Sequence, residues 1–118
     1  MCPNFKRVLR YTVSDQRQVV YLRFIIANIF DAKTEKHLMT GFINPEAWKK
    51  TQETKVVHFW STSRDELWRK GATSGNEMKV VWQKLDCDRD TADIYVDIQG
   101  DGVACHTGQK SCFFNEVL

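Results

Sequence analysis

Three aspartates alternate with two other residues in the segment from residue 86 to residue 90, which reads Asp-Cys-Asp-Arg-Asp. In an extended chain successive side chains point to opposite faces, so Asp86, Asp88 and Asp90 would share one face. Three carboxylates on one face repel one another. A hard divalent cation such as Mg²⁺ or Ca²⁺, which prefers oxygen ligands, relieves that repulsion. The segment therefore predicts a magnesium or calcium site.

Two other interpretations of the acidic segment were weighed against a metal site. A solvated acidic turn accounts equally well for three alternating aspartates. An EF-hand calcium loop requires glycine at its sixth position and a helix on each side. This chain has Thr91 at that position and predicted strands on both sides, which argues strongly against an EF-hand.

Two thiols and an imidazole lie within eight residues, at Cys105, His106 and Cys112. Such groups are ligands for a soft or borderline metal such as zinc. Their C-x6-C spacing is not a standard zinc motif, and buried or unpaired thiols are the alternative interpretation. Cys87 would add a third thiolate and leave the fourth coordination position for water, as a catalytic zinc site requires.

A loop rich in glycine, serine and threonine is predicted at residues 68–76. Its glycines allow a ligand to approach the backbone closely, and its basic and hydroxyl side chains suit a phosphate oxyanion. An ordinary surface loop can have the same composition, and the Walker spacing of an ATP-type P-loop is absent. The candidate substrate contacts in and before this loop are Ser61, Ser63, Arg64, Trp68, Arg69, Lys70, Thr73, Ser74 and Gly75.

The elements that must position these groups are mostly strands. Runs of β-branched and aromatic residues, and period-two alternation, predict strands. These strands are expected at residues 19–30, 37–43, 56–61, 77–85 and 94–98. The fold class is therefore mainly β (α+β), with small mixed or antiparallel strands and one or two short helices.

One clear helix and a polar arm complete the predicted fold. Asn44 can cap the helix and Pro45 suits its first position, where a missing N–H costs nothing, so a helix is predicted to about residue 53. Residues 31–36 form a polar turn that joins the first two strands into a hairpin. Residues 1–18 are polar and basic, and we expect a loosely held arm there.

The composition is that of a single globular domain, residues 1–118. The chain is 42% hydrophobic and 27% charged, with a formal net charge of +2. This weak, scattered charge argues against binding to a nucleic-acid polymer. No run approaches the ~20 apolar residues of a membrane helix, and no signal segment is evident. We therefore expect a cytoplasmic protein whose four cysteines are ligands or thiols rather than disulfides.

Taken together, four segments resemble the phosphoribosyl-AMP cyclohydrolases in order and spacing. They are HFWSTSR at residues 58–64, LWRKGATSGN at 67–76, LDCDRD at 85–90 and ACHTGQKSCFF at 104–114. A weaker likeness extends back to Asp31. The resemblance implies an enzyme that hydrolyses the N1–C6 bond of the adenine ring in 1-(5-phosphoribosyl)-AMP, the third step of histidine biosynthesis.

The resemblance also implies the cofactors and the assembly. Zinc would be held by Cys87, Cys105 and Cys112, and Mg²⁺ by the three aspartates of the acidic segment. The family forms an intertwined homodimer in which both subunits contribute zinc ligands. His106 neighbours a zinc ligand, and histidine is the side chain most often used as a general base, so it is the candidate catalytic general base.

The sequence departs from the family pattern outside the metal ligands. Family members commonly carry Glu at the position of Ala72, and a Pro and a Gln-Asp pair around residues 27–31, while residues 1–20 match nothing in the family. One alternative is therefore a paralogue that hydrolyses another modified purine nucleotide. A second alternative is a non-catalytic zinc module in which His106 closes the coordination shell.

Overall fold

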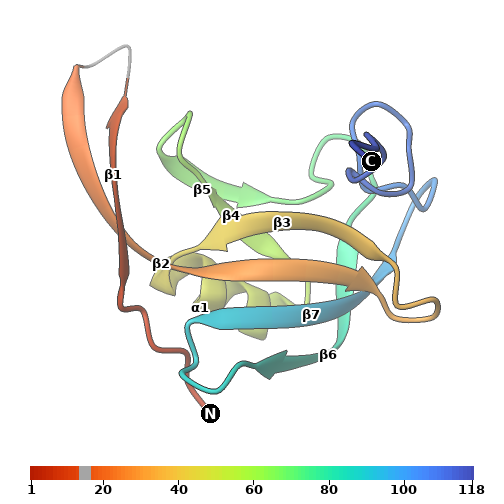
Figure 1. Ribbon diagram of the computed structural model, residues 1–118, viewed down its shortest axis with the longest axis horizontal. Helices are drawn as coiled ribbons and strands as arrows, with labels where there is room; N and C mark the ends of the chain where they lie inside the picture. Colours follow the sequence, from red (N-terminus) through yellow and green to blue (C-terminus); the bar gives the residue numbers. More distant parts are fainter. Residues whose placement is uncertain (14–16) are drawn as a thin grey trace.

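A mixed β-sheet dominates the computed structural model, which describes residues 1–13 and 17–118 (Figure 1). Within those residues the sheet contains β1 (Arg7–Val13), β2 (Gln18–Asp31), β3 (His37–Ile43), β6 (Met78–Leu85) and β7 (Thr91–Ile98). The short strands β4 (His58–Ser61) and β5 (Glu66–Arg69) form a hairpin of their own, and α1 (Pro45–Thr54) follows β3. The predicted class, mainly β with a short helix, is confirmed.

The long strand β2 organises the sheet because it pairs with three other strands. Its first half is antiparallel to β1, with Arg7 opposite Phe24. Its second half is antiparallel to β3 and parallel to β7, and β6 runs antiparallel beside β7. The predicted hairpin of β2 and β3 is confirmed, and the parallel β2–β7 pair makes the sheet mixed.

The described N-terminal residues do not form the loosely held arm that was predicted for residues 1–18, of which residues 14–16 lie outside the described part of the chain. Arg7–Val13 make up β1, whose side chains alternate between exposed and more buried positions as in an ordinary strand. The backbone N–H of Asn4 also donates to the carbonyl of Arg89 at 2.7 Å. The polar composition misled because the strand is stabilised by pairing with β2 rather than by its own sequence.

The remaining predicted elements are present with shifted boundaries. The strands expected at residues 77–85 and 94–98 are β6 and β7, and the strand expected at residues 56–61 begins at His58. The loop expected at residues 68–76 is shorter, since Trp68 and Arg69 still pair within β5 and the turn begins at Lys70.

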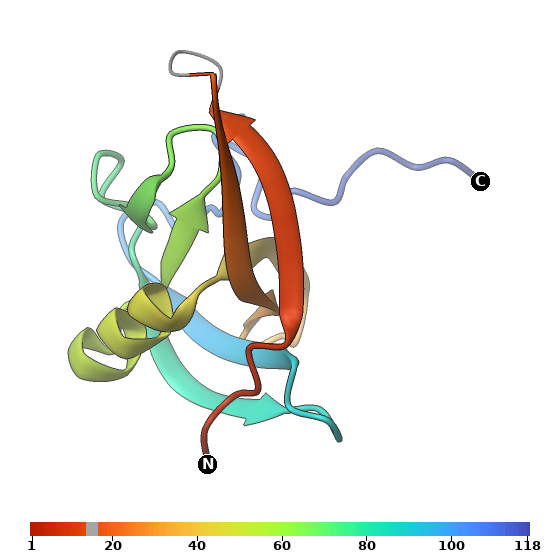
Figure 2. The ribbon, with the colours of Figure 1, turned by 90° about the vertical axis from the view of Figure 1, so that its left-hand side faces the viewer.

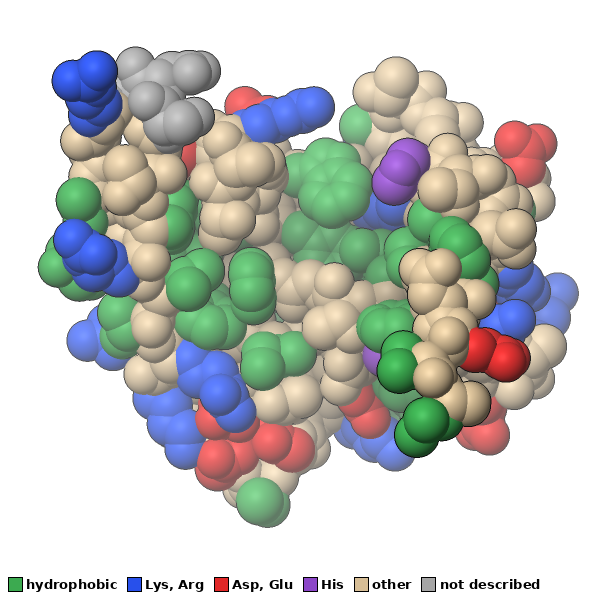
Figure 3. All heavy atoms as spheres, turned by 45° about the horizontal axis from the view of Figure 1, so that its top comes forward, with side chains coloured by type: hydrophobic (Ala, Val, Ile, Leu, Met, Phe, Trp, Pro, Cys, Tyr) green, Lys and Arg blue, Asp and Glu red, His purple; other side chains and the backbone are tan. Residues whose placement is uncertain are grey.

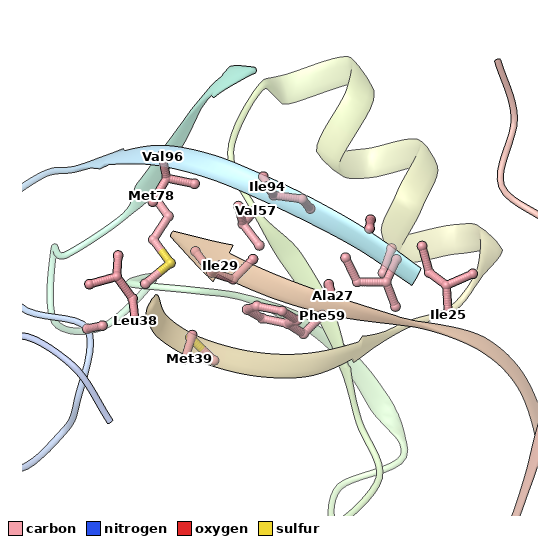
Figure 4. Packing of buried hydrophobic residues seen from close by; sticks show 14 residues of the cluster. Ile25, Ala27, Ile29, Leu38, Met39, Val57, Phe59, Met78, Ile94 and Val96 are labelled. Carbon is pink, nitrogen blue, oxygen red and sulfur yellow. The ribbon is translucent and has the colours of Figure 1, made fainter. Parts of the chain in front are cut away.

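The hydrophobic core lies on the face of the sheet that α1 covers (Figures 2 and 4). Alternate residues of the central strands, among them Ile25 and Ile29 on β2 and Ile94 on β7, are fully buried there. Gly41 on β3 lets Phe59 pack directly against the sheet, because a Cβ at residue 41 would lie 2.5 Å from the phenyl ring. The core thereby fixes the β4–β5 hairpin against β3.

The helix begins where its sequence predicts. Asn44 Oδ1 accepts a hydrogen bond from the N–H of Ala47 at 2.9 Å, and Pro45 occupies the first turn. Thr51 ties α1 to β4, because its hydroxyl accepts from the N–H of His58 at 2.9 Å. No helix within the described residues is long and apolar enough to cross a membrane.

The opposite face of the sheet carries a row of stacked aromatic rings, with hydrophobic side chains visible at the surface in Figure 3. Ring centres are separated by 4.0 Å between Trp82 and Tyr95, 5.1 Å between Tyr95 and Phe30, 5.0 Å between Phe30 and His37, and 4.4 Å between His37 and Phe113. The two ends of the row are exposed, Trp82 by 44% and Phe113 by 60%. We call these five residues the aromatic row.

Candidate active site

The three aspartates meet at the turn between β6 and β7. One carboxylate oxygen from each of Asp86, Asp88 and Asp90 lies within 4.8 Å of the others. Asp86 Oδ1 accepts hydrogen bonds from the N–H groups of Asp90 and Thr91, both at 3.1 Å, and Arg89 adopts a left-handed backbone conformation. A tight turn therefore brings the carboxylates together, and the predicted alternation of an extended segment is wrong.

Basic side chains from the N-terminal segment contact this acidic turn. Lys6 Nζ lies 2.7 Å from Asp88 Oδ2 and 3.7 Å from Asp90 Oδ2, and Arg7 Nε lies 3.2 Å from Asp90 Oδ2. The hydrogen bond from Lys6 is the main reason why the pKa of Asp88 is lowered to about 2. Figure 3 shows acidic side chains gathered with basic side chains directly beside them. The turn attracts cations, and the cations that contact it here are the Lys6 ammonium and the Arg7 guanidinium of the same chain.

Two of the predicted zinc ligands come together in the loop that follows β7. The N–H of Cys105 donates to the carbonyl of Gln109 at 3.2 Å, which folds the loop back on itself. The N–H of Cys112 donates to the carbonyl of Leu38 at 2.7 Å, which fixes the second thiol beside β3. Cys105 is buried, Cys112 is half-buried, and both are free thiols. The loop thus presents two neighbouring sulfur atoms.

The two thiols differ in their tendency to ionise. The Thr107 hydroxyl donates to Cys105 Sγ at 3.0 Å, and this bond lowers the pKa of Cys105. Burial raises the pKa of Cys112, and the neighbouring Cys105 raises it further. Because metals bind thiolates, Cys105 is the readier ligand, and Cys112 needs a nearby positive charge to ionise.

Lys70 supplies positive charge beside both thiols. Its ammonium lies 5.2 Å from the centre of the Trp68 ring, and the side chain is half-buried. Burial lowers the pKa of Lys70, while the charges of Cys112 and Cys105 act in the opposite direction. The lysine therefore favours the thiolate forms that a metal requires.

The third predicted zinc ligand, Cys87, lies far from the other two within one chain. It is exposed in the turn before β7, whereas Cys105 and Cys112 follow the other end of that strand (Figure 1). At about 3.3 Å per residue, β7 alone separates the two ends by roughly 20 Å. Among the described residues, only the aspartate cluster brings three metal-ligating side chains together.

A cavity of about 580 Å³ opens between the loop after β5 and the loop after β7. Several residues singled out in the sequence line it together: Lys70, Thr73, Ser74, Cys105 and His106. His106 is exposed and directly follows a thiol of the pair. The cavity therefore combines hydroxyl groups, an ammonium, an imidazole and a thiol at one surface.

A second cavity, of about 290 Å³, adjoins the first. It is lined by Ser61, Ser63, Arg64, Glu66 and Trp68. Arg64 and Trp68 line both cavities, so they stand at the boundary between them.

Two of the predicted substrate contacts lie outside both cavities. Arg69 Nε is 3.2 Å from Glu77 Oε2, so its charge is engaged in an ion pair beside the site. Gly75 lines neither cavity. Ala72, where the family pattern has Glu, lines the larger cavity instead.

Asn76 is a site residue for which no role was predicted from the sequence. It is 9% exposed, and its Oδ1 accepts a hydrogen bond from the N–H of Asp101 at 2.8 Å. Gly100 permits this contact, because a Cβ there would lie 2.3 Å from Asn76 Oδ1. The bond holds together the two loops that form the larger cavity. No local pattern predicts it, because its partners are 25 residues apart.

The fold and the site define a small, mainly β protein with thiol and carboxylate groups of the kinds that bind metal ions in metal-dependent enzymes. A model of the family described as phosphoribosyl-AMP cyclohydrolase matches residues 39–114. A phosphoribosyl-AMP cyclohydrolase of Brucella anthropi is 46% identical over 94 residues, which cover 80% of this chain and 67% of that protein. The same enzyme of Brucella abortus (strain 2308) is 46% identical over 94 residues, covering 80% of this chain and 79% of that protein.

The chain therefore belongs to the phosphoribosyl-AMP cyclohydrolase family. This is a family of metal-dependent hydrolases with a step in histidine biosynthesis, and the resemblance predicted from the four sequence segments is confirmed. The family model begins at residue 39, so β1 and β2 lie outside the matched range.

Proposed function

We propose that this protein hydrolyses the N1–C6 bond of the adenine ring in 1-(5-phosphoribosyl)-AMP, with zinc and magnesium as cofactors. The observation that carries the proposal is that, in a chain of this family, Cys105, Lys70 and His106 line one cavity. That cavity offers the groups needed to hold a metal, to balance its ligands and to accept a proton. The hydroxyl-rich wall beside them suits the phosphates of a nucleotide.

The residues present fit a zinc ion. Cys87, Cys105 and Cys112 would hold it, since three thiolates form a tight but open zinc site. Zinc bound there supplies a water of lowered pKa. Three thiolates and one zinc carry a net charge of −1, and the Lys70 ammonium beside two of the sulfurs offsets that charge. This compensation is a role for Lys70 beyond a substrate contact.

His106 acts as the general base. It lines the cavity next to Cys105, with its ring exposed to the space where substrate enters. C6 of the N1-substituted adenine is electrophilic because the ring carries positive character. His106 accepts a proton from the water that attacks C6, and general-base catalysis of this kind contributes about 10²–10⁴ in rate.

A homodimer supplies the missing thiolate. Cys87 and the Cys105–Cys112 pair lie at opposite ends of β7, so one chain cannot assemble the zinc site. A twofold axis that lies in the plane of the interface, perpendicular to β7, packs the face that bears the aromatic row against the same face of the partner and reverses the direction of the partner's β7. The acidic-turn end of one chain then meets the thiol loop of the other. Exposed Trp82 and Phe113 give this face the apolar surface of an interface.

Magnesium would be held by Asp86, Asp88 and Asp90, whose oxygens already converge. Bound there, the ion supplies positive charge for a substrate phosphate. Because Lys6 contacts two of these carboxylates, magnesium must compete with its ammonium.

Replacing Lys6 by alanine is therefore expected to tighten magnesium binding by about two- to fivefold, a small effect because exposed ion pairs are weak. Titration calorimetry of the purified protein with MgCl₂ measures it directly. Lys50→Ala, on the exposed surface of α1, is the matched control and should leave the affinity unchanged. Equal magnesium affinities for the Lys6 variant and the parent protein would contradict the competition.

A related modified purine nucleotide is the second candidate substrate. The observation that favours it is Ala72, which lines the larger cavity where the family pattern has Glu. A smaller, uncharged side chain there removes one group that could contact the substrate.

The ring-opening reaction tests the proposed function. Adenine-ring opening of phosphoribosyl-AMP is followed by absorbance with the purified protein, before and after a chelator and after zinc is restored. Activity that is lost with the chelator and regained with zinc supports the proposal. Steady activity in metal-free protein, or no ring opening in the zinc-loaded protein, would refute it.

A further inference from the structure

A chain of hydrogen bonds joins the N-terminal strand to the β4–β5 hairpin. Trp60 Nε1 donates to the hydroxyl oxygen of Tyr11 at 3.0 Å, and that hydroxyl donates to the Asp65 carboxylate. Tyr11 is half-buried on β1, which lies outside the residues matched by the family model. In Figure 1 the β1–β2 hairpin rises beside the β4–β5 hairpin. The β4–β5 hairpin is therefore held in part by a residue that lies outside the range matched by the family model.

Asp65 lies in the turn between β4 and β5, whose residues line the smaller cavity. Its neighbours Arg64 and Glu66 line that cavity together with Ser61 and Ser63. Asp65 has a left-handed backbone conformation with φ 52°, which aspartate tolerates better than most residues other than glycine and which turns the chain sharply here.

Within the turn itself, few interactions fix the cavity wall. The Ser61 and Ser63 hydroxyl groups lie 3.2 Å apart, and the N–H of Arg64 reaches Ser61 Oγ only at 3.4 Å. Arg64 and Glu66 form an exposed ion pair at 3.9 Å. Such contacts are weak, so the bond from Tyr11 to Asp65 is the strongest polar contact that the described residues make between this turn and the rest of the fold.

The phenol is suited to remain a donor. Burial raises the pKa of Tyr11, and the Asp65 carboxylate raises it further, so the hydroxyl keeps its proton at neutral pH. A protonated phenol bonded to a carboxylate is a charge-assisted hydrogen bond, which is stronger than a neutral one.

We propose that Tyr11 is a positioning residue for substrate. Through Asp65 it holds the turn so that Ser61, Ser63 and Arg64 present two hydroxyl groups and a guanidinium to one phosphate of a nucleotide. Arg64 lines both cavities, so a phosphate in the smaller cavity would leave the larger one for the base and the thiol pair. This inference rests on the proposed function, since it assigns the second cavity to a phosphate of the same substrate.

The test compares Tyr11→Phe, which keeps the ring and loses only the hydroxyl, with Tyr21→Phe on the exposed surface of β2. For Tyr11→Phe the KM for phosphoribosyl-AMP is expected to rise about three- to tenfold with kcat within about twofold, the effect of losing one charge-assisted hydrogen bond. The Tyr21 variant should match the parent protein. Asp65→Asn keeps an oxygen acceptor and should lose less than Asp65→Ala.

AMP binding, measured by calorimetry, separates this inference from the proposed function. AMP carries one phosphate of the substrate class and requires no turnover. Weaker AMP binding by a Tyr11→Phe protein that is still folded at the assay temperature supports the positioning role even in a protein that fails to open phosphoribosyl-AMP. Unchanged AMP affinity and KM, or a fall in kcat alone, would overturn it. If Tyr11→Phe does not fold, the same KM and AMP-binding measurements on Asp65→Asn and Asp65→Ala test the positioning role instead.

Discussion

Replacing Cys105 by serine is expected to remove zinc and ring-opening activity together. The hydrogen bond that Thr107 donates to its sulfur lowers the pKa of Cys105, whereas burial raises the pKa of Cys112, so Cys105 is the thiol that more readily offers a thiolate to a metal. A serine hydroxyl stays protonated at neutral pH and is a poor zinc ligand. Zinc content by mass spectrometry and the ring-opening rate, measured on the same preparation, should both fall to background.

Cys2→Ser is the matched control for this loss, because Cys2 is an exposed thiol of the N-terminal segment. It should keep both zinc and activity. A Cys105 variant that retains its zinc while losing activity would place the metal elsewhere. A variant that loses its zinc and keeps full activity would show that the ring-opening reaction does not require zinc.

Replacing His106 by alanine is expected to lower kcat by about 10²–10⁴, the usual contribution of a general base. The KM should change little, since the imidazole acts on the attacking water and not on the phosphates. Zinc content should remain that of the parent protein, because the proposed ligands are three cysteines. Steady-state kinetics with metal analysis measures all three quantities.

Gln109→Ala provides the control for His106, since Gln109 is an exposed side chain of the same loop whose structural bond uses its backbone carbonyl. It should leave kcat unchanged. If His106→Ala raises KM alone, the imidazole binds substrate instead of moving a proton. If it releases zinc, the histidine is a ligand and the site is the closed coordination of a structural zinc module.

Much of the fold follows from local patterns in the sequence. The β-branched and aromatic run of β2, the alternating apolar residues of β7 and the Asn44–Pro45 start of α1 are local signals. Each predicts its element, although β7 begins at Thr91 and not at residue 94. The strand β1 was missed because its pairing with β2, rather than its composition, makes it a strand. Tertiary context overrides propensity most easily in such polar strands.

The candidate site shows the same division between local and long-range information. Residue types and spacing singled out the aspartates and the thiols, but the aspartates converge through a tight turn and not through strand alternation. The contact of Lys6 with Asp88 joins residues 82 apart, and the bond from Tyr11 to Asp65 spans 54. No periodicity encodes such pairs, because they arise when β1 is placed against β2 and beside the acidic turn.

The central claim is that two chains share each zinc site, and mixed dimers of two inactive variants test it most directly. Cys87→Ser and Cys105→Ser chains, each expected to be inactive alone, are co-expressed so that mixed dimers form. With random mixing, half of the dimers are mixed and each has one intact site of two, so about a quarter of the parent activity should return, with zinc in the same proportion. Purified mixed dimers that bind no zinc and have no ring-opening activity would contradict a zinc site shared between two chains. Zinc bound by the Cys87→Ser protein on its own would contradict it as well.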